Sequence, residues 1–290
     1  MPNRPVFRFA PSPNGELHLG HALSALIGFE RAAALGGRFL LRIEDIDAER
    51  SRAQFIAGIF EDLRWLGLCW PEPVLYQSQR FAAYRAASAR LEAMGVLYPC
   101  FATRAEIAAA ADTADRDPDG APLYPGLFRH WPAADIAARK ASGERFALRL
   151  DMGRALAAAR GKLGEAALSF RELDEAGAAR TIAAAPERWG DAILVRKDVP
   201  TSYHLAVVVD DAWQGVTHVT RGRDLFAATD LHRLLQVLLD LPAPHYQHHR
   251  LIADASGRKL AKSQAATSLS QLRRQGLTPA DVRRAIGLAG

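Results

Sequence analysis

The first part of the chain contains three hydrophobic segments with different spacing. Residues Val6–Ala10 form a short run typical of a strand. Apolar positions from Leu19 to Ile27 recur with the period of a helix, which we expect to end near Gly36–Gly37. Residues Phe39–Ile43 are apolar enough for a buried parallel strand. The pattern predicts a strand–helix–strand unit and therefore an α/β fold.

The middle of the chain has a different pattern. Residues 96–188 are rich in alanine, lack a sustained strand pattern and include the polar loop 112–120, so we interpret them as an insertion. Apolar runs and a capping threonine then predict further elements. These are strands at Ile193–Val195, Leu205–Val209 and Leu251–Ile252, a helix over Ala228–Leu239 and a helix beginning at Thr278–Pro279.

Composition and charge narrow the class of protein. The chain has 290 residues, 49% of them hydrophobic and 24% charged, with a net charge of +5. The segment from His245 to the end carries eight Lys and Arg against two Asp, which permits a polyanionic partner; a solvated helical surface is the alternative. Two cysteines exclude a disulfide framework, and no apolar run approaches the ~20 residues of a membrane span. The residues at the amino terminus do not form a signal peptide, so we expect a cytoplasmic protein.

Two short motifs could carry chemistry on phosphates. His18-Leu19-Gly20-His21 follows the proline-rich turn Pro11–Gly15 and begins the first helix, where free N–H groups and the helix dipole favour phosphate. Gly20 would let a flat base approach the backbone. Lys259-Leu260-Ala261-Lys262-Ser263 could place two lysines over a triphosphate and stabilise departing pyrophosphate. Each motif alone is weak, since surface histidines and basic loops are common.

Together the two motifs resemble the HIGH and KMSKS signatures of class I aminoacyl-tRNA synthetases, with Leu260 and Ala261 in place of Met and Ser. The resemblance implies ATP binding by His18, Gly20, His21 and Lys262, and catalytic roles for His18, His21, Lys259 and Lys262. It also implies a Rossmann-like parallel sheet that carries an inserted α+β subdomain. The corresponding division is 1–95 and 189–263 for the two halves of the catalytic domain, 96–188 for the insertion and 264–290 for a short helical tail.

Further blocks are similar to the glutamate-specific members of this family. They are Arg8–Gly15, Arg42–Asp47 with Arg50, Tyr203–Ala206 with Asp210–Asp211, and Thr217–Gly222. By resemblance, Arg8 binds the side-chain carboxylate of glutamate and Arg221 the α-carboxylate, as the fork geometry of arginine allows. Glu44 would pair with the ammonium, and Ser12 and Tyr203 would hydrogen-bond the substrate.

Other polar residues near these blocks have structural interpretations. We expect Asp45 and Asp47 to form an ion-pair cluster with Arg42 and Arg50. We do not expect Glu44 to join it, because Glu44 would bind the substrate. His204 and His218 would be core residues or would support the site from behind.

Two departures from complete glutamyl-tRNA synthetases point to a paralogous group. Val207 stands where the complete enzymes have Asn, and only 27 residues follow Ser263, which leaves no room for their anticodon-reading region. Both features, with the run Asp210–Ala212, are similar to glutamyl-queuosine tRNA(Asp) synthetases. The resemblance implies L-glutamate, ATP and tRNA(Asp) as substrates, and glutamate transfer to queuosine in the anticodon. A truncated synthetase charging the tRNA 3′ end and an inactive tRNA-binding module remain alternatives.

Metal content follows from the same resemblance. Mg²⁺ is expected with the nucleotide. Relatives often hold zinc with Cys-x-Cys and Tyr-x-x-x-Cys, but here Ala102 and Phe128 replace two of the four ligands, and only Cys100 and Tyr124 remain. We therefore expect no zinc, no other protein-bound metal site, and Cys100 and Cys69 as small buried hydrophobic residues. We expect a monomer.

Overall fold

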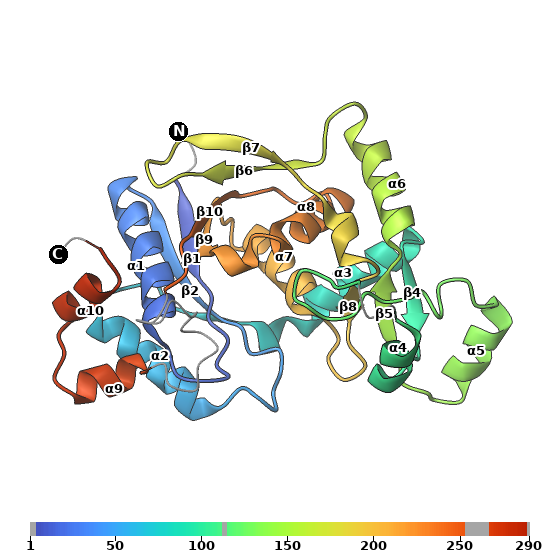
Figure 1. Cartoon of the computed structure of the whole chain (residues 1–290), viewed down its shortest axis with the longest axis horizontal. Helices are drawn as coiled ribbons and strands as arrows, with labels where there is room; N and C mark the ends of the chain where they lie inside the picture. Colours follow the sequence, from blue (N-terminus) through green and yellow to red (C-terminus); the bar gives the residue numbers. More distant parts are fainter. Residues whose placement is uncertain (1–3, 112–114, 253–266, 289–290) are drawn as a thin grey trace.

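The computed structural model describes residues 4–111, 115–252 and 267–288 (Figure 1). Its main feature is a seven-stranded sheet in the order β3-β2-β1-β9-β10-β6-β7. Six strands are parallel, and β7 joins the edge antiparallel to β6. The strands are β1 (Val6–Phe9), β2 (Arg38–Ile43), β3 (Leu75–Tyr76), β6 (Ser169–Leu173), β7 (Ala179–Ala183), β9 (His218–Gly222) and β10 (His245–His249). This parallel sheet with flanking helices confirms the predicted α/β class.

A second, antiparallel sheet has the order β4-β5-β8, with strands β4 (Leu97–Cys100), β5 (Ala147–Leu150) and β8 (Ile193–Val195). The longer helices are α1 (Leu19–Ala34), α2 (Ala53–Trp65), α3 (Phe81–Ala93), α6 (Met152–Leu163), α7 (Tyr203–Trp213) and α8 (Ala228–Leu238). The shorter ones are α4 (Arg104–Ala110), α5 (Ala133–Ala141), α9 (Leu269–Arg274), α10 (Pro279–Ala285), η1 (Gln77–Arg80), η2 (Pro186–Trp189) and η3 (Arg223–Leu225). Among these helices, none is long and apolar enough to cross a membrane.

The predicted strand–helix–strand unit is confirmed as β1, α1 and β2. Apolar side chains of α1, including Leu23 and Leu26, pack on one face of the sheet together with Phe7 and Phe39. The helix ends because Gly36 adopts a positive φ of 61°, a conformation that glycine accepts without steric cost. The backbone N–H of Gly37 then closes the turn on the carbonyl of Ala32.

Two predicted strands were wrong. Leu205–Val209 belongs to α7, which Ser202 caps by accepting from the N–H of Leu205. Leu205 through Val208 are all buried because neighbouring helices pack around them, and a fully buried helix gives the same apolar run as a buried strand. The last strand among the described residues is His245–His249 and not Leu251–Ile252, because pairing with β9 and β6 on both sides buries an otherwise polar segment.

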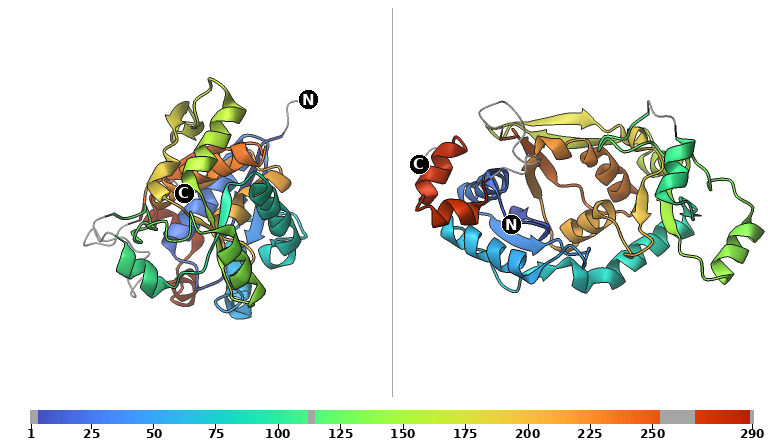
Figure 2. Two further views of the ribbon diagram at one scale, coloured as in Figure 1. Left: turned by 90° about the vertical axis from the view of Figure 1, so that its right-hand side faces the viewer. Right: turned by 60° about the horizontal axis from the view of Figure 1, so that its bottom comes forward.

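The segment expected as an insertion contributes to both sheets. β4 and β5 pair with β8, whereas β6 and β7 extend the large sheet beyond β10. Figure 2 shows α4 and α5 at one end of the molecule and α9 and α10 at the opposite end. The domain boundaries themselves stay a prediction.

The carboxyl-terminal helices fold back on the first half of the sheet. The predicted start at Thr278 is confirmed, because its hydroxyl caps α10 with Asp281 in a reciprocal capping box. Ion pairs hold the two helices: Arg273 lies 2.8 Å from Glu61 on α2, and Arg283 lies 2.5 Å from Glu30 on α1. Two of the basic residues that were expected to face a polyanion, Arg273 and Arg283, therefore form ion pairs inside the protein.

Candidate active site

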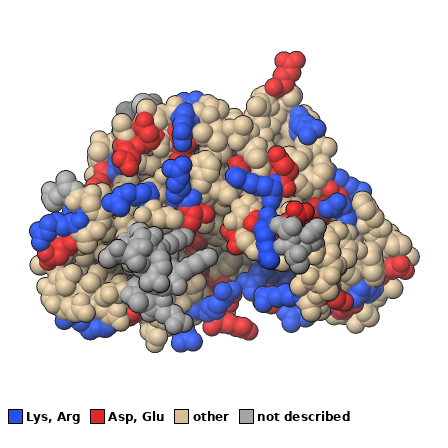
Figure 3. Space-filling model, in the orientation of Figure 1, with Lys and Arg blue, Asp and Glu red and all other residues tan. Residues whose placement is uncertain are grey.

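A cavity of about 430 Å³ lies at the carboxyl ends of β1 and β9. The chain leaves β1 toward β2 on one side of the sheet and β9 toward β10 on the other. This is the topological switch point where parallel α/β sheets bind ligands. Figure 3 shows a hollow near the centre of this face with Lys and Arg side chains along its rim. Predicted residues from distant segments meet here: Arg8, Ser12, His18, Gly20, His21, Glu44, Tyr203 and Arg221 all line the cavity.

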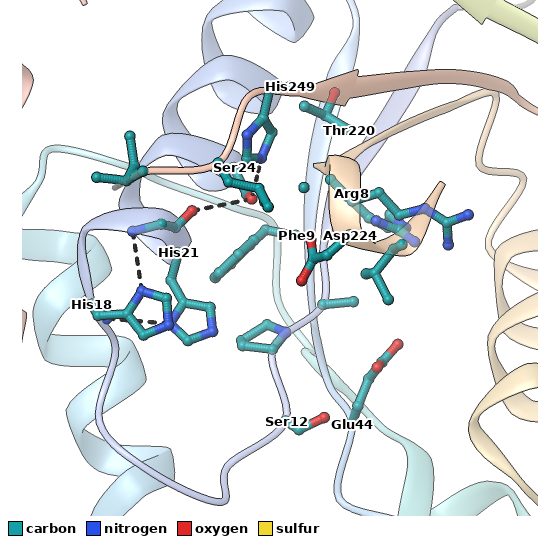
Figure 4. Close-up of a pocket in the computed structure, with 18 of the residues that line it drawn as sticks. Arg8, Phe9, Ser12, His18, His21, Ser24, Glu44, Thr220, Asp224 and His249 are labelled. Carbon is teal, nitrogen blue, oxygen red and sulfur yellow. Dashed lines mark hydrogen bonds between the residues drawn. The ribbon is translucent and has the colours of Figure 1, made fainter. Parts of the chain in front are cut away.

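The two histidines of the HLGH motif cap α1. Nδ1 of His18 accepts from the backbone N–H of Gly20 at 3.1 Å, and Nδ1 of His21 accepts from the N–H of His18 at 3.2 Å. Burial, followed by the neighbouring His18, lowers the pKa of His21 to about 3, so this ring is neutral. Because both Nδ1 atoms accept, each ring carries its proton on Nε2. Figure 4 shows the two rings side by side at the edge of the cavity, where they can donate to phosphate oxygens.

Gly20 is needed for a reason that the sequence did not reveal. A Cβ atom at this position would lie 2.9 Å from the ring of His18. Glycine therefore makes room for the capping imidazole, in addition to any role in admitting a nucleotide.

Arg8 and Glu44 belong to a buried network of opposite charges. Arg8 lies 3.2 Å from Asp211, and Arg42 lies 2.7 Å from the same carboxylate oxygen and 3.4 Å from Glu44. Burial alone would raise the pKa of Asp211, but Arg8 and Arg42 hold it below its usual value. Burial raises the pKa of Glu44 despite the same arginines. Glu44 thus contacts Arg42, which the sequence interpretation had not expected, while it still faces the cavity (Figure 4).

Arg221 has a different environment. Its guanidinium is bonded to neutral partners, with Nη1 lying 3.4 Å from the hydroxyl of Tyr203. The other partners are His232, His248 and Thr229. Within the described part of the chain, no carboxylate lies within 4.0 Å of it. Arg221 is 4% exposed and lines the cavity.

The sequence did not predict a contact between two residues that line the cavity. The hydroxyl of Ser24 on α1 lies 2.6 Å from Nε2 of His249, at the end of β10 (Figure 4). Ser24 is one turn beyond Gly20 on the same helix face, and this spacing was the available signal. Asp224, which follows β9, also lines the cavity. Nothing in the local sequence places it there.

The lysines of the second motif, Lys259 and Lys262, and the adjoining Ser263 lie outside the described residues. The flanks of this segment are described. Ile252 lines the cavity, and the N–H of Leu269 donates to the carbonyl of Leu17 at 2.7 Å. The chain therefore leaves and re-enters the described structure beside the HLGH turn.

The remaining polar residues have mainly structural partners. Asp47 pairs with Arg50 as predicted, and also with Arg196. Asp45 does not join this cluster, because it accepts from both the N–H and the hydroxyl of Ser78. His204 hydrogen-bonds His232, and His218 stacks on Phe7. Their structural roles stay a prediction.

The four positions considered above for zinc form part of an apolar cluster. Sγ of Cys100 lies 3.3 Å from the Tyr124 hydroxyl, and Ala102 and Phe128 are buried beside them. Within the described ranges, no three His, Cys, Asp or Glu side chains are grouped so as to hold a metal. Cys100 is buried as predicted, but Cys69 is exposed, because it lies in the loop after α2 and not in the core.

A second cavity of about 660 Å³ adjoins the first. It lies between the β6–β7 hairpin and the ends of β9 and β10. The two cavities share the residues Asp224, His249, Arg250 and Leu251. A molecule in the second cavity can therefore approach one held in the first.

The architecture of class I aminoacyl-tRNA synthetases combines a parallel sheet, a ligand cavity at its switch point and an HLGH-type turn at the edge of that cavity. This chain has all three features. The chain matches the family model "tRNA synthetases class I (E and Q), catalytic domain" over residues 6–290. It belongs to this family and is a ligase-type enzyme, as the sequence motifs predicted.

The relatives differ in how much of their own length this chain covers: nearly all of some, and about half of others. The chain is 47% identical to a glutamyl-Q tRNA(Asp) synthetase of Rhodobacter capsulatus, over 98% of this chain and 100% of the relative. It is 40% identical to a protein of the same name from Symbiobacterium thermophilum, over 95% and 83%. A crystal structure of a glutamate tRNA ligase from Elizabethkingia meningosepticum has the same fold, with a TM-score of 0.69 at 24% identity, covering 95% of this chain and 54% of that one.

Proposed function

We propose that this enzyme activates L-glutamate with ATP to glutamyl-adenylate and transfers the glutamyl group to queuosine in the anticodon of tRNA(Asp). The observation that carries the first step is the convergence of Arg8, Arg221 and Glu44 on one cavity opposite the two capping histidines. Glutamate offers two carboxylates and one ammonium, which complement two guanidiniums and one carboxylate. The names and near-complete coverage of the relatives support the acceptor.

The activation step needs positioning more than proton transfer. A carboxylate oxygen of glutamate attacks the α-phosphorus of ATP in line, an O–P bond forms, and the bond to the β-phosphate oxygen breaks to release pyrophosphate. His18 and His21 donate from Nε2 to phosphate oxygens, and their neutral state leaves these donors unchanged through the reaction. Mg²⁺ enters with the nucleotide, and Lys259 and Lys262 stabilise the leaving pyrophosphate.

Transfer requires a second substrate to reach the activated carbonyl. A hydroxyl of queuosine attacks that carbonyl, the ester bond forms, AMP leaves with the electron pair of the broken acyl–phosphate bond, and the hydroxyl proton passes to the departing phosphate or to water. The second cavity offers an approach, because it shares four lining residues with the first. Bases of an RNA loop can be splayed out and held singly in such a cavity.

Glutamate-dependent exchange of labelled pyrophosphate into ATP tests the first step. Glutamine should exchange at least ~10⁴-fold less efficiently, because its NH₂ group would place donor hydrogens against the Arg8 guanidinium where an acceptor oxygen is needed. Equal exchange with glutamine would contradict the assignment of glutamate.

Labelled glutamate tests the acceptor. It should appear in the anticodon fragment of tRNA(Asp) and only when the tRNA carries queuosine. Label on the 3′-terminal adenosine would identify a conventional synthetase. Exchange without label on any tRNA would leave glutamate activation in place and reject the acceptor.

A further inference from the structure

We propose that Glu172 and His248 are positioning residues that fix Arg221 through a carboxylate–imidazole–guanidinium relay, with His232 supporting it from a second side. The relay holds Arg221 for the substrate without forming an ion pair with it. The inference rests on the proposed function for its substrate and on the hydrogen bonds for its geometry.

The relay crosses three neighbouring strands. Arg221 on β9 and His248 on β10 are directly opposite in the sheet, and Glu172 lies on β6, the next strand. Nε of Arg221 lies 3.1 Å from Nε2 of His248, and Nδ1 of His248 lies 2.8 Å from Oε2 of Glu172. The side chains of His248 and Glu172 are 1% and 6% exposed, so solvent does not compete for these bonds.

Only one form of His248 satisfies both contacts. The Nε–H of Arg221 is a donor, so Nε2 of His248 must accept and carry no proton. The single proton of the neutral ring is then on Nδ1, which donates to Glu172. The hydroxyl of Thr229, 3.2 Å from Nε2, can also donate to it. Burial and the nearby Arg221 lower the pKa of His248 to about 4 in spite of Glu172, in agreement with a neutral ring.

Glu172 selects this form of the ring. An isolated imidazole exchanges its proton between the two nitrogens, and the partner of one nitrogen decides the state of the other. Glu172 also accepts from the backbone N–H of His248 at 3.0 Å, so its carboxylate is held at two points. The buried carboxylate therefore keeps Nε2 available as an acceptor for Arg221.

A second imidazole repeats this arrangement. Nη1 of Arg221 lies 3.3 Å from Nδ1 of His232, whose Nε2 lies 3.1 Å from Nδ1 of His204. His232 must therefore carry its proton on Nε2 and donate it to His204. Nη2 of Arg221 completes the set by donating to the Thr229 hydroxyl at 2.7 Å.

The neutral partners of Arg221 have a consequence for binding. Arg8 contacts the carboxylate of Asp211 directly, whereas Arg221 contacts imidazoles and hydroxyls, which orient a guanidinium without neutralising it. A substrate carboxylate entering the cavity then meets a cation that is already oriented and that has no ion-pair partner among the described residues to displace. Such preorganisation reduces the cost of binding.

Enzyme kinetics can separate positioning from general stability. His248→Leu removes the acceptor and should raise the glutamate KM in pyrophosphate exchange on the order of tenfold, as expected for a lost bond to a charged group, with the ATP KM within about twofold. His248→Gln can place an amide oxygen near the position of Nε2 and should recover the glutamate KM to within about threefold. Glu172→Gln should raise it about threefold or more.

The matched control is His245→Gln. This histidine is on the same strand, but its side chain is exposed at the opposite end, so its variant should behave as the wild type. Thermal unfolding of each variant identifies loss of folding. An unchanged glutamate KM in His248→Leu, or an equal rise in both KM values, would overturn the relay.

Nitrogen NMR of ¹⁵N-histidine-labelled protein tests the geometry without any activity. The signal that disappears in His248→Gln should show a proton on Nδ1 near neutral pH, and it should shift toward the Nε2-protonated form in Glu172→Gln. An Nε2-protonated or doubly protonated His248 in the wild type would overturn the relay. An absence of glutamate-dependent exchange with the expected NMR result would instead reject the proposed substrate alone.

Discussion

Nε of Arg8 lies 3.2 Å from Oδ1 of Asp211, which is 203 positions further along the chain. The same oxygen lies 2.7 Å from Nη2 of Arg42, so one carboxylate holds two buried guanidiniums in place. The substrate-facing surface of the cavity therefore depends on a residue that does not line it. This dependence has a measurable effect on stability.

Asp211→Asn should lower the free energy of unfolding by roughly 3–5 kcal/mol, because it leaves buried guanidiniums without their compensating charge. The pH dependence follows from the lowered pKa of Asp211. This carboxylate stabilises the fold above its unfolded pKa of about 3.9, and that contribution is lost as the pH falls through the lower folded value. Urea unfolding from pH 7 to pH 3 should show this loss in the wild type and less of it in the variant.

Asp198→Asn is the matched control, since Asp198 pairs with Arg196 at the surface and is half exposed. Its effect should stay below about 1 kcal/mol. Equal losses for both variants would mean that the buried network does not stabilise the fold more than a surface pair.

His18 has two functions that substitution can separate. His18→Asn retains an oxygen that can cap α1, so stability should change by less than about 0.5 kcal/mol. It removes the Nε2–H donor, so kcat/KM for ATP should fall by roughly 10²-fold.

Thr278→Ala, at the cap of α10, is the control and should show the opposite result. The free energy of unfolding should fall by about 1 kcal/mol, and the rate of pyrophosphate exchange should not change. A normal exchange rate in His18→Asn would restrict His18 to a capping role.

The purified protein should contain no stoichiometric zinc, and chelators should leave its thermal midpoint unchanged. The apolar cluster around Phe128 would then hold this region, with Phe101 5.6 Å away and the guanidinium of Arg139 5.3 Å from the Phe128 ring. Phe128→Ala should cost about 3–5 kcal/mol. Elemental analysis giving about one zinc per chain, lost in Cys100→Ala, would contradict the prediction.

The spacing of apolar residues correctly predicted those helices and strands that have one buried face or one continuous buried run. The periodicity of β1, α1 and β2 was sufficient because each has one dominant apolar spacing. It failed at Leu205–Val209, since a helix buried on all sides reads as a strand. It failed again at His245–His249, where strands on both sides bury a polar segment.

The resemblance to synthetase motifs predicted part of the site, whereas the spacing of hydrophobic residues predicted almost none of it. The motif residues Arg8, His18 and Arg221 reach one cavity as expected. Their supporting partners, such as Asp211 for Arg8 and Glu172 for His248, are brought to them only by the tertiary fold. Tautomers and charge states depend on these partners and could not be read from the sequence.

The role of Lys262 stays a prediction, because this residue lies outside the described part of the chain. The segment that contains it begins beside Ile252, which lines the cavity, and ends near Ser268, which pairs with His18. If Lys262 stabilises charge as pyrophosphate leaves, Lys262→Ala should lower kcat for exchange by roughly 10²–10³. The glutamate KM should change little, since glutamate binds at Arg8 and Arg221.

Lys162→Ala serves as the control for the loss of one lysine, because Lys162 pairs with Asp240 at the surface of α6. It should leave exchange unchanged. Lys262→Arg restores the charge with a different shape, so partial recovery is expected if electrostatics dominate. A Lys262→Ala enzyme with wild-type kcat would contradict the role of Lys262 in stabilising the leaving pyrophosphate.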